Sequence, residues 1–156
     1  GNESATYHAS LGVNQTNNTA KGNDQTQYTG NISVGTHLWE NITLGISLAG
    51  SISETNAFLG ADPFTYASTM NRAIPNTTED GELFFYQHAD NGYLFNVVNE
   101  LQNSSNKNTL SNINASMNLR WQIIDHLSFT TTMGYAFSSS EGESYYTEQS
   151  NKKIQF

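Results

Sequence analysis

The segment NITLGISLAGSIS, residues 41–53, alternates between apolar and small uncharged residues. Its apolar phase consists of Ile42, Leu44, Ile46, Leu48, Gly50 and Ile52. A period of two is typical of a strand with one apolar and one polar face. The polar phase carries only Asn, Ser, Thr, Gly and Ala, whereas soluble proteins usually place charged side chains on such a face. The pattern therefore raises the question of what covers each face.

The same alternation recurs in four further segments and predicts five strands. The predicted ranges are 5–14, 27–39, 42–53, 110–123 and 127–139. None of the five apolar phases contains a charged residue, and the ionisable groups of the polar phases are His8, His37 and Arg120. Because a midplane Arg or Lys costs roughly 2–4 kcal/mol on the lipid face of a barrel, this pattern suits contact with hydrocarbon.

The connections between these segments alternate in length. Tight turns are predicted at 39–41 and 124–126, a polar link joins the first two strands, and a long external loop spans about 55–108. The stretch SSSEGES, residues 138–144, is interpreted as another external loop. Short turns alternating with long loops are typical of outer-membrane barrels. We therefore predict an all-β fold, a segment of an antiparallel transmembrane β-barrel.

The number of strands adds a second expectation. Five strands cannot close a membrane barrel, whose smallest examples have about eight. An open edge in lipid would leave backbone groups unpaired. Under the membrane interpretation, residues 1–156 form part of a larger barrel. A soluble β-sandwich or meander with the same alternation remains the alternative.

Composition narrows the classes of function. The chain has 6 Lys and Arg against 14 Asp and Glu, a formal charge of −8, which argues against nucleic acid as a partner. Charged residues make up 13% of the chain, and there is no cysteine. A thiolate metal site and a disulfide framework are thereby excluded for this chain.

The long loop contains the stretch DPFTYASTMNRAIPNTTEDGELFFYQ, residues 62–87. Its Asp62-Pro63-Phe64-Thr65-Tyr66-Ala67 run, Arg72 with Pro75, the Glu79-Asp80-Gly81 turn and the aromatic Leu83–Tyr86 segment resemble an external loop of the SusC/RagA family of TonB-dependent outer-membrane transporters. The flanking hairpins, 28–56 and 112–138, are similar to paired strands of that family. The resemblance covers nearly all of the chain as a mid-barrel section.

This resemblance implies a role in nutrient uptake. Members of the family are plugged barrels of about 22 strands in the outer membrane of Gram-negative Bacteroidetes. They import oligosaccharides or peptides with a SusD-like surface lipoprotein as a lid, and the TonB complex supplies the energy. The plug, the TonB-contact sequence and the closing strand are expected to lie in regions absent from this chain. A soluble carbohydrate-binding module is the alternative function.

The loop also supplies the candidate contacts for a ligand or partner. These are Phe64, Tyr66, Arg72, Phe84, Tyr86 and Tyr93, in the region richest in aromatic residues. Aromatic side chains suit stacking and protein interfaces, although we expect most of them to form a small core within the loop. We expect Arg72 to form an ion pair with Asp62, Glu79 or Asp80.

The remaining motifs do not indicate a catalytic site. Asp80-Gly81 predicts a hairpin turn, and calcium there remains open although the EF-hand spacing is absent. The four histidines lack zinc spacing, and no nucleophile elbow is present. We therefore expect neither a catalytic residue nor a cofactor.

Overall fold

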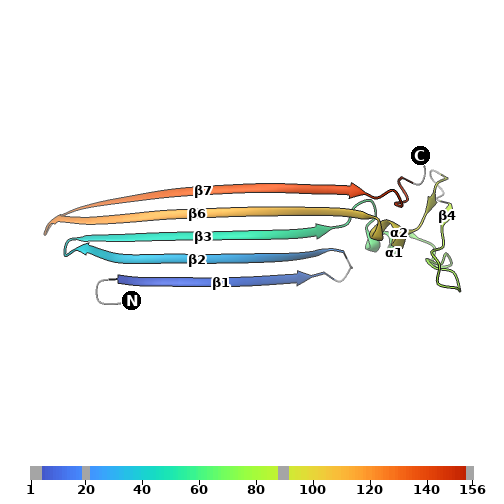
Figure 1. The fold of residues 1–156 in the computed structure, drawn as a ribbon, viewed down its shortest axis with the longest axis horizontal. Coiled ribbons are helices and arrows are strands. Elements are labelled where there is room, and N and C mark those ends of the chain that lie inside the picture. The colour runs from blue at the N-terminus through green and yellow to red at the C-terminus, as the bar shows by residue number, and fades with distance from the viewer. Residues whose placement is uncertain (1–4, 19–21, 88–91, 154–156) are drawn as a thin grey trace. The chain divides into compact units, whose positions relative to one another are not determined.

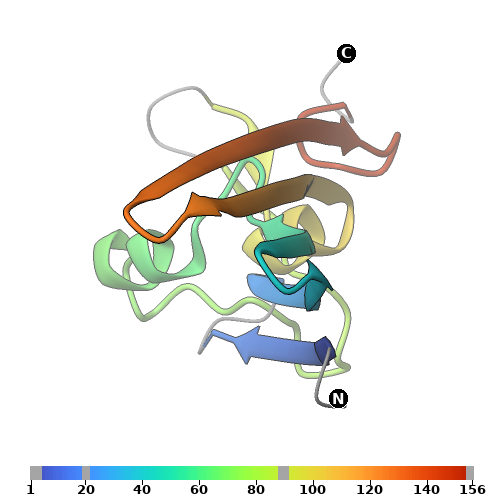
Figure 2. The same ribbon diagram turned by 90° about the vertical axis from the view of Figure 1, so that its left-hand side faces the viewer.

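The computed structural model describes residues 5–18, 22–87 and 92–153. Its main element is a five-stranded antiparallel sheet with the order β1-β2-β3-β6-β7. Figure 1 shows these strands side by side in that order, and Figure 2 shows that they form one twisted layer. The expected all-β class is confirmed, with 65% of the described residues in strands. The sheet is open, with β1 and β7 at its edges.

Each predicted strand lies within an observed strand. The five strands are β1 (Ala5–Asn17), β2 (Asp24–Trp39), β3 (Ile42–Ala57), β6 (Ser104–Ile124) and β7 (Leu127–Tyr146). The two-residue turns Glu40–Asn41 and Asp125–His126 join β2 to β3 and β6 to β7. Residues 88–91 of the long loop, which include His88, lie outside the described residues.

The strands are longer than predicted at the ends away from the two-residue turns. The prediction that 138–144 is a loop is wrong, because this stretch belongs to β7. There the Ser144 hydroxyl donates to Asn106 Oδ1 over 2.8 Å, from β7 to β6. Polar segments can extend a ladder through backbone hydrogen bonds alone. Apolar alternation marks only the part of a strand that has an apolar face, so it missed these extensions.

The chain divides into two units, which are described separately. The sheet unit comprises Gly1–Gln15, Thr26–Glu54 and Thr109–Glu141. The loop unit comprises Thr16–Gln25, Thr55–Asn108 and Gly142–Phe156. The long strands contribute residues to both units. The boundaries thus separate the alternating part of the sheet from its polar extensions and the long connection.

The polar face of the sheet unit carries cross-strand hydrogen bonds between small side chains. Ser47 and Ser116 hydroxyls lie 2.7 Å apart, and the Asn118 amide donates to Thr132 Oγ1 over 3.0 Å. Close approach also occurs here, since a Cβ on Gly12 would lie 2.7 Å from Thr29 Oγ1. Cross-strand pairs of this kind stabilise a sheet locally.

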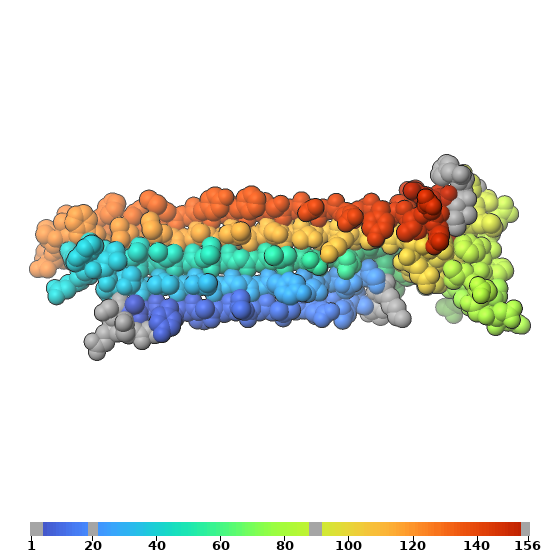
Figure 3. All heavy atoms as spheres, in the orientation of Figure 1, coloured from blue at the N-terminus to red at the C-terminus, as the bar shows by residue number. Residues whose placement is uncertain are grey.

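The apolar face of the sheet unit is uncovered among the described residues. Leu11 of β1 lies beside Gly30 of β2, 3.4 Å from where a Cβ would stand, yet it is 94% exposed. Ile46, in the central strand, is 47% exposed. The aliphatic and aromatic side chains of all five strands share this exposure. Figure 3 shows the strands from one side, with their atoms in parallel rows. Val97, in the loop unit, is the only buried hydrophobic residue described.

The loop unit contains two short helices and a small hairpin. Helix α1 covers Pro63–Thr69 and α2 covers Val97–Gln102, while the two-residue strands β4 (Tyr86–Gln87) and β5 (Leu94–Phe95) pair antiparallel. The expected turn at Glu79-Asp80-Gly81 is present. The Gly81 amide donates to the Thr78 carbonyl over 3.0 Å, and Gly81 itself takes the positive φ of 87°. Among the described residues, neither helix is long and apolar enough to cross a bilayer.

Candidate functional site

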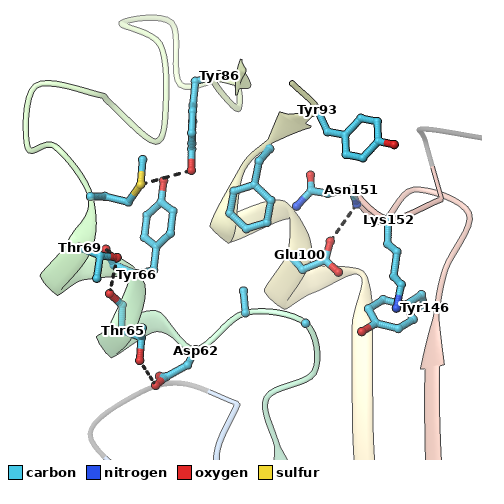
Figure 4. Close-up of a pocket in the computed structure, with 14 residues that line it drawn as sticks. Asp62, Thr65, Tyr66, Thr69, Tyr86, Tyr93, Glu100, Tyr146, Asn151 and Lys152 are labelled. Atoms are coloured by element: carbon cyan, nitrogen blue, oxygen red, sulfur yellow. Dashed lines mark hydrogen bonds between the residues drawn. The ribbon is translucent and has the colours of Figure 1, made fainter. Parts of the chain in front are cut away.

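A pocket of about 690 Å³ opens in the loop unit. This volume lies within the range of roughly 300–1,000 Å³ that small-ligand sites occupy. Figure 4 shows its walls, which come from α1, β4, β5, α2 and the segment after β7. Its main lining side chains are Asp62, Thr65, Tyr66, Thr69, Met70, Tyr86, Tyr93, Phe95, Glu100, Tyr146, Asn151 and Lys152.

Helix α1 presents one wall because of a strong local start signal. The Asp62 side chain accepts from the Phe64 amide over 3.0 Å and from the Thr65 hydroxyl over 2.8 Å. Pro63 follows at the first helical position, where its missing N–H is harmless. The Thr65 hydroxyl bond and then the Phe64 amide bond lower the pKa of Asp62 below its ordinary value of 3.8.

Three rings from α1, β4 and β5 pack together in the pocket. The Phe95 ring centroid lies 5.8 Å from that of Tyr66 and 6.1 Å from that of Tyr86, the latter edge to face. The Tyr86 hydroxyl points to Met70 Sδ at 3.5 Å. Burial, followed by a side-chain hydrogen bond with Tyr66, raises the pKa of Tyr86 above its ordinary value of 10. Tyr86 therefore keeps its proton and offers the pocket a neutral phenol.

The floor is held by a buried polar network centred on Asn96, the N-cap of α2. Asn96 is 1% exposed. Its Nδ2 donates to the carbonyls of Asn76 and Phe84, each over 2.7 Å, and its Oδ1 accepts from the Asn99 amide. Asn151 Nδ2 in turn donates to the Asn96 carbonyl over 2.7 Å. This network joins the segments that carry the pocket walls.

Glu100 and Lys152 bring charge to the pocket. Glu100, on α2, is 3% exposed, and its Oε2 accepts from the Asn151 amide over 2.8 Å. Lys152 Nζ lies 4.7 Å from the centroid of the Tyr146 ring. Gly60 sits against Glu100 and the Tyr146 ring with φ +83°, and a Cβ there would lie 2.8 Å from Glu100 Oε1.

The six candidate residues separate into two groups. Tyr66, Tyr86 and Tyr93 line the pocket, whereas Phe64, Arg72 and Phe84 do not. Arg72 is exposed and forms no ion pair with any residue that the structure describes. The expected ion pair is therefore wrong, because Asp62 is engaged as a helix cap and Glu79 and Asp80 lie in an exposed turn.

Comparison with known proteins adds no relative. No protein-family model and no curated protein matched the chain. Any functional conclusion therefore depends on the residues and their geometry. Within the described ranges, no three His, Cys, Asp or Glu side chains gather as a metal site.

Sequence reasoning missed Glu100, Tyr146, Asn151 and Lys152 as pocket residues. Glu100 lies much later in the same long connection as Tyr66, and the other three come at or after the end of β7. No local pattern therefore links them to Tyr66. A signal for α1 was present, since Asp followed by Pro marks a helix N-cap and first position. That signal would have placed Tyr66 on a helix.

The Asp62 cap leads to a test in the loop unit. In Asp62→Ala, amides in the first turn of α1 should exchange with solvent several-fold faster, because the side chain no longer accepts the Phe64 amide. Hydrogen exchange of the peptide covering 62–70 measures this effect.

Asp62→Asn is the matched control, since asparagine caps as well as aspartate but does not titrate. Because folding lowers the pKa of Asp62, its carboxylate stabilises α1 fully above 3.8. The effect is lost as the pH falls through the lower folded value. Acid-dependent fraying should be weaker in Asp62→Asn than in the wild type, and equal pH profiles would contradict the capping role.

Proposed function

We propose that this chain is a section of an outer-membrane TonB-dependent transporter that imports oligosaccharides or peptides. The observation that carries the proposal is the apolar sheet face, which is free of charge and uncovered among the described residues. Soluble monomers rarely expose contiguous apolar patches larger than a few hundred Å². Acyl chains on this face, and water along the Ser-, Thr- and Asn-rich face, account for both surfaces.

The length of the uncharged zone supports the membrane assignment. In the sheet unit, Glu40 and Asp125 lie at the two-residue turns, and Glu54 and Glu141 lie toward the other ends of β3 and β7. The stretch 42–53 of β3 rises about 40 Å at about 3.3 Å per residue. A tilt of 35–45° reduces this to about 28–32 Å across the membrane. The hydrocarbon core of a bilayer is about 30 Å thick.

One of the two tryptophans fits the same placement. Trp121 belongs to the apolar phase of β6 and lies near its end, close to a two-residue turn, and it is 42% exposed. Trp39, at the end of β2, belongs to the opposite phase. Tryptophan is enriched where the hydrocarbon meets the headgroups. One membrane interface would then lie near the two-residue turns, on the periplasmic side.

The open edges of the sheet imply further strands. β1 and β7 each have a neighbour on one side only, and unpaired backbone groups in hydrocarbon cost several kcal/mol each. In the proposed assembly these edges pair with the remaining strands of a barrel of about 22. A plug, a SusD-like lipoprotein and the TonB complex complete the transporter through regions outside this chain.

The loop unit takes the external role in this proposal. Its pocket is lined by aromatic side chains and a few polar groups, the composition typical of small-ligand sites. Substrate would meet this region before passing along the polar face. The role consists of binding and passage, without a chemical step.

Uptake measurements test this proposal. Cells that produce the intact protein containing this chain should accumulate a labelled oligosaccharide or peptide, and the protein should fractionate with the outer membrane. Removal of the TonB complex should abolish the uptake. Recovery as a detergent-free soluble monomer would refute the proposal and favour the soluble carbohydrate-binding module.

A further inference from the structure

One oxygen of a buried carboxylate faces the pocket without a partner. Glu100 is only 3% exposed. Among the described residues, only its Oε2 forms a hydrogen bond. Ser150 Oγ is the only buried side-chain polar atom described that lacks a partner. Glu100 Oε1 is therefore reachable from the pocket that it lines. A carboxylate oxygen in a residue that is otherwise so buried favours a ligand with a strong donor.

Aromatic rings line the pocket together with this carboxylate. Tyr66, Tyr86, Phe95 and Tyr146 line the same pocket, and Figure 4 shows Glu100 between Tyr146 and the rings of the opposite wall. The negative faces of aromatic rings attract cations within about 6 Å of the centroid. A carboxylate among such rings favours a ligand that carries positive charge.

The protein already places an organic cation in this pocket. Lys152 Nζ lies 4.7 Å from the Tyr146 centroid, and Lys152 forms no ion pair with Glu100. The ring thus holds an ammonium group while the carboxylate oxygen stays available. Acidic residues also outnumber basic ones among the described residues of the loop unit, so the local potential should attract cations.

We propose that this pocket binds an organic ammonium group, with Glu100 Oε1 as the charge partner and the aromatic rings as the cage. Lys152 acts as an internal competitor for the Tyr146 face. The volume of about 690 Å³ leaves room for the body of a ligand attached to the ammonium group. This inference deepens the proposed function by naming a cationic substrate class. The relevance of the pocket to uptake rests on that proposed function.

The test uses choline and its uncharged isostere, in which a tert-butyl group replaces the trimethylammonium group. Calorimetry on the intact protein in detergent should show at least about tenfold tighter binding of choline, about 1.4 kcal/mol. Glu100→Gln, which keeps an acceptor for the Asn151 amide, should remove most of that selectivity. Lys152→Met should tighten choline binding, because it frees the Tyr146 ring.

Three outcomes would overturn the inference. They are equal affinity for choline and its isostere, unchanged selectivity in Glu100→Gln, and binding of a neutral saccharide in place of choline. Hydrogen exchange over 97–102 checks that each variant keeps α2. Membrane fractionation of the same preparation separates the two proposals: a membrane-embedded protein that ignores choline refutes the pocket assignment alone, and a soluble protein refutes the transporter.

Discussion

Ile46→Arg is expected to prevent assembly of the protein in the outer membrane. Ile46 belongs to the apolar phase of β3, near the middle of the uncharged stretch, and no described residue covers it. An arginine at the bilayer midplane on the lipid face costs roughly 2–4 kcal/mol. The amount of folded protein in outer-membrane fractions should therefore fall by about tenfold or more.

Ser47→Arg is the matched control on the opposite face of the same strand. Ser47 shares a hydrogen bond with Ser116, whose loss costs roughly 1 kcal/mol. Arginine at this position would reach the aqueous interior, so assembly should remain close to the wild-type level. Equal loss or equal tolerance in both variants would contradict the assignment of the two faces.

Asn96→Leu is expected to have the largest effect on the loop unit. The substitution keeps the branched shape of the side chain but leaves the Phe84 carbonyl and the Asn99 amide without a partner. The Asn76 carbonyl loses one donor and still accepts from the Phe84 amide. Each buried polar group left unsatisfied costs about 1–3 kcal/mol, so the free energy of local opening at α2 should fall by at least about 2 kcal/mol.

Hydrogen exchange of the peptides covering 92–103 measures this opening free energy. Gln102→Leu provides the control, because Gln102 lies on the exposed side of the same helix and forms no hydrogen bond through its side chain among the described residues. Its protection should match the wild type. Wild-type protection in Asn96→Leu would show that the asparagine network does not hold the pocket.

The sheet could be predicted from sequence because its signal is local. In β3, two-residue alternation fixes which side chains share a face, and the observed hydrogen bond between Ser47 and Ser116 lies on the predicted polar face. The polar extension of β7 to Tyr146 was missed because residues such as Ser140 and Glu141 have no apolar counterpart in their alternation. Pairing there depends on neighbouring strands, which a single segment does not encode.

The loop unit was less predictable because its interior is polar. A search for apolar periodicity finds aromatic residues such as Tyr66, but the most buried side chains include Asn96, Asn99 and Asn151. Their burial is stabilised by hydrogen bonds between distant segments, such as Asn151 Nδ2 to the Asn96 carbonyl. Glu100 was missed for the same reason, since its exposure to the pocket depends on the position of Asn151.

A spin-label scan along β3 tests the account most directly. The chain contains no cysteine, so single cysteines at positions 42–53 provide unique attachment sites in this region of the lipid-embedded protein. Labels at Leu44, Ile46 and Leu48 should collide with dissolved oxygen, and those at Gly45, Ser47 and Ala49 with a water-soluble nickel chelate. Labels on the aliphatic positions that are shielded from both reagents would show that protein covers this face, which would contradict the transporter.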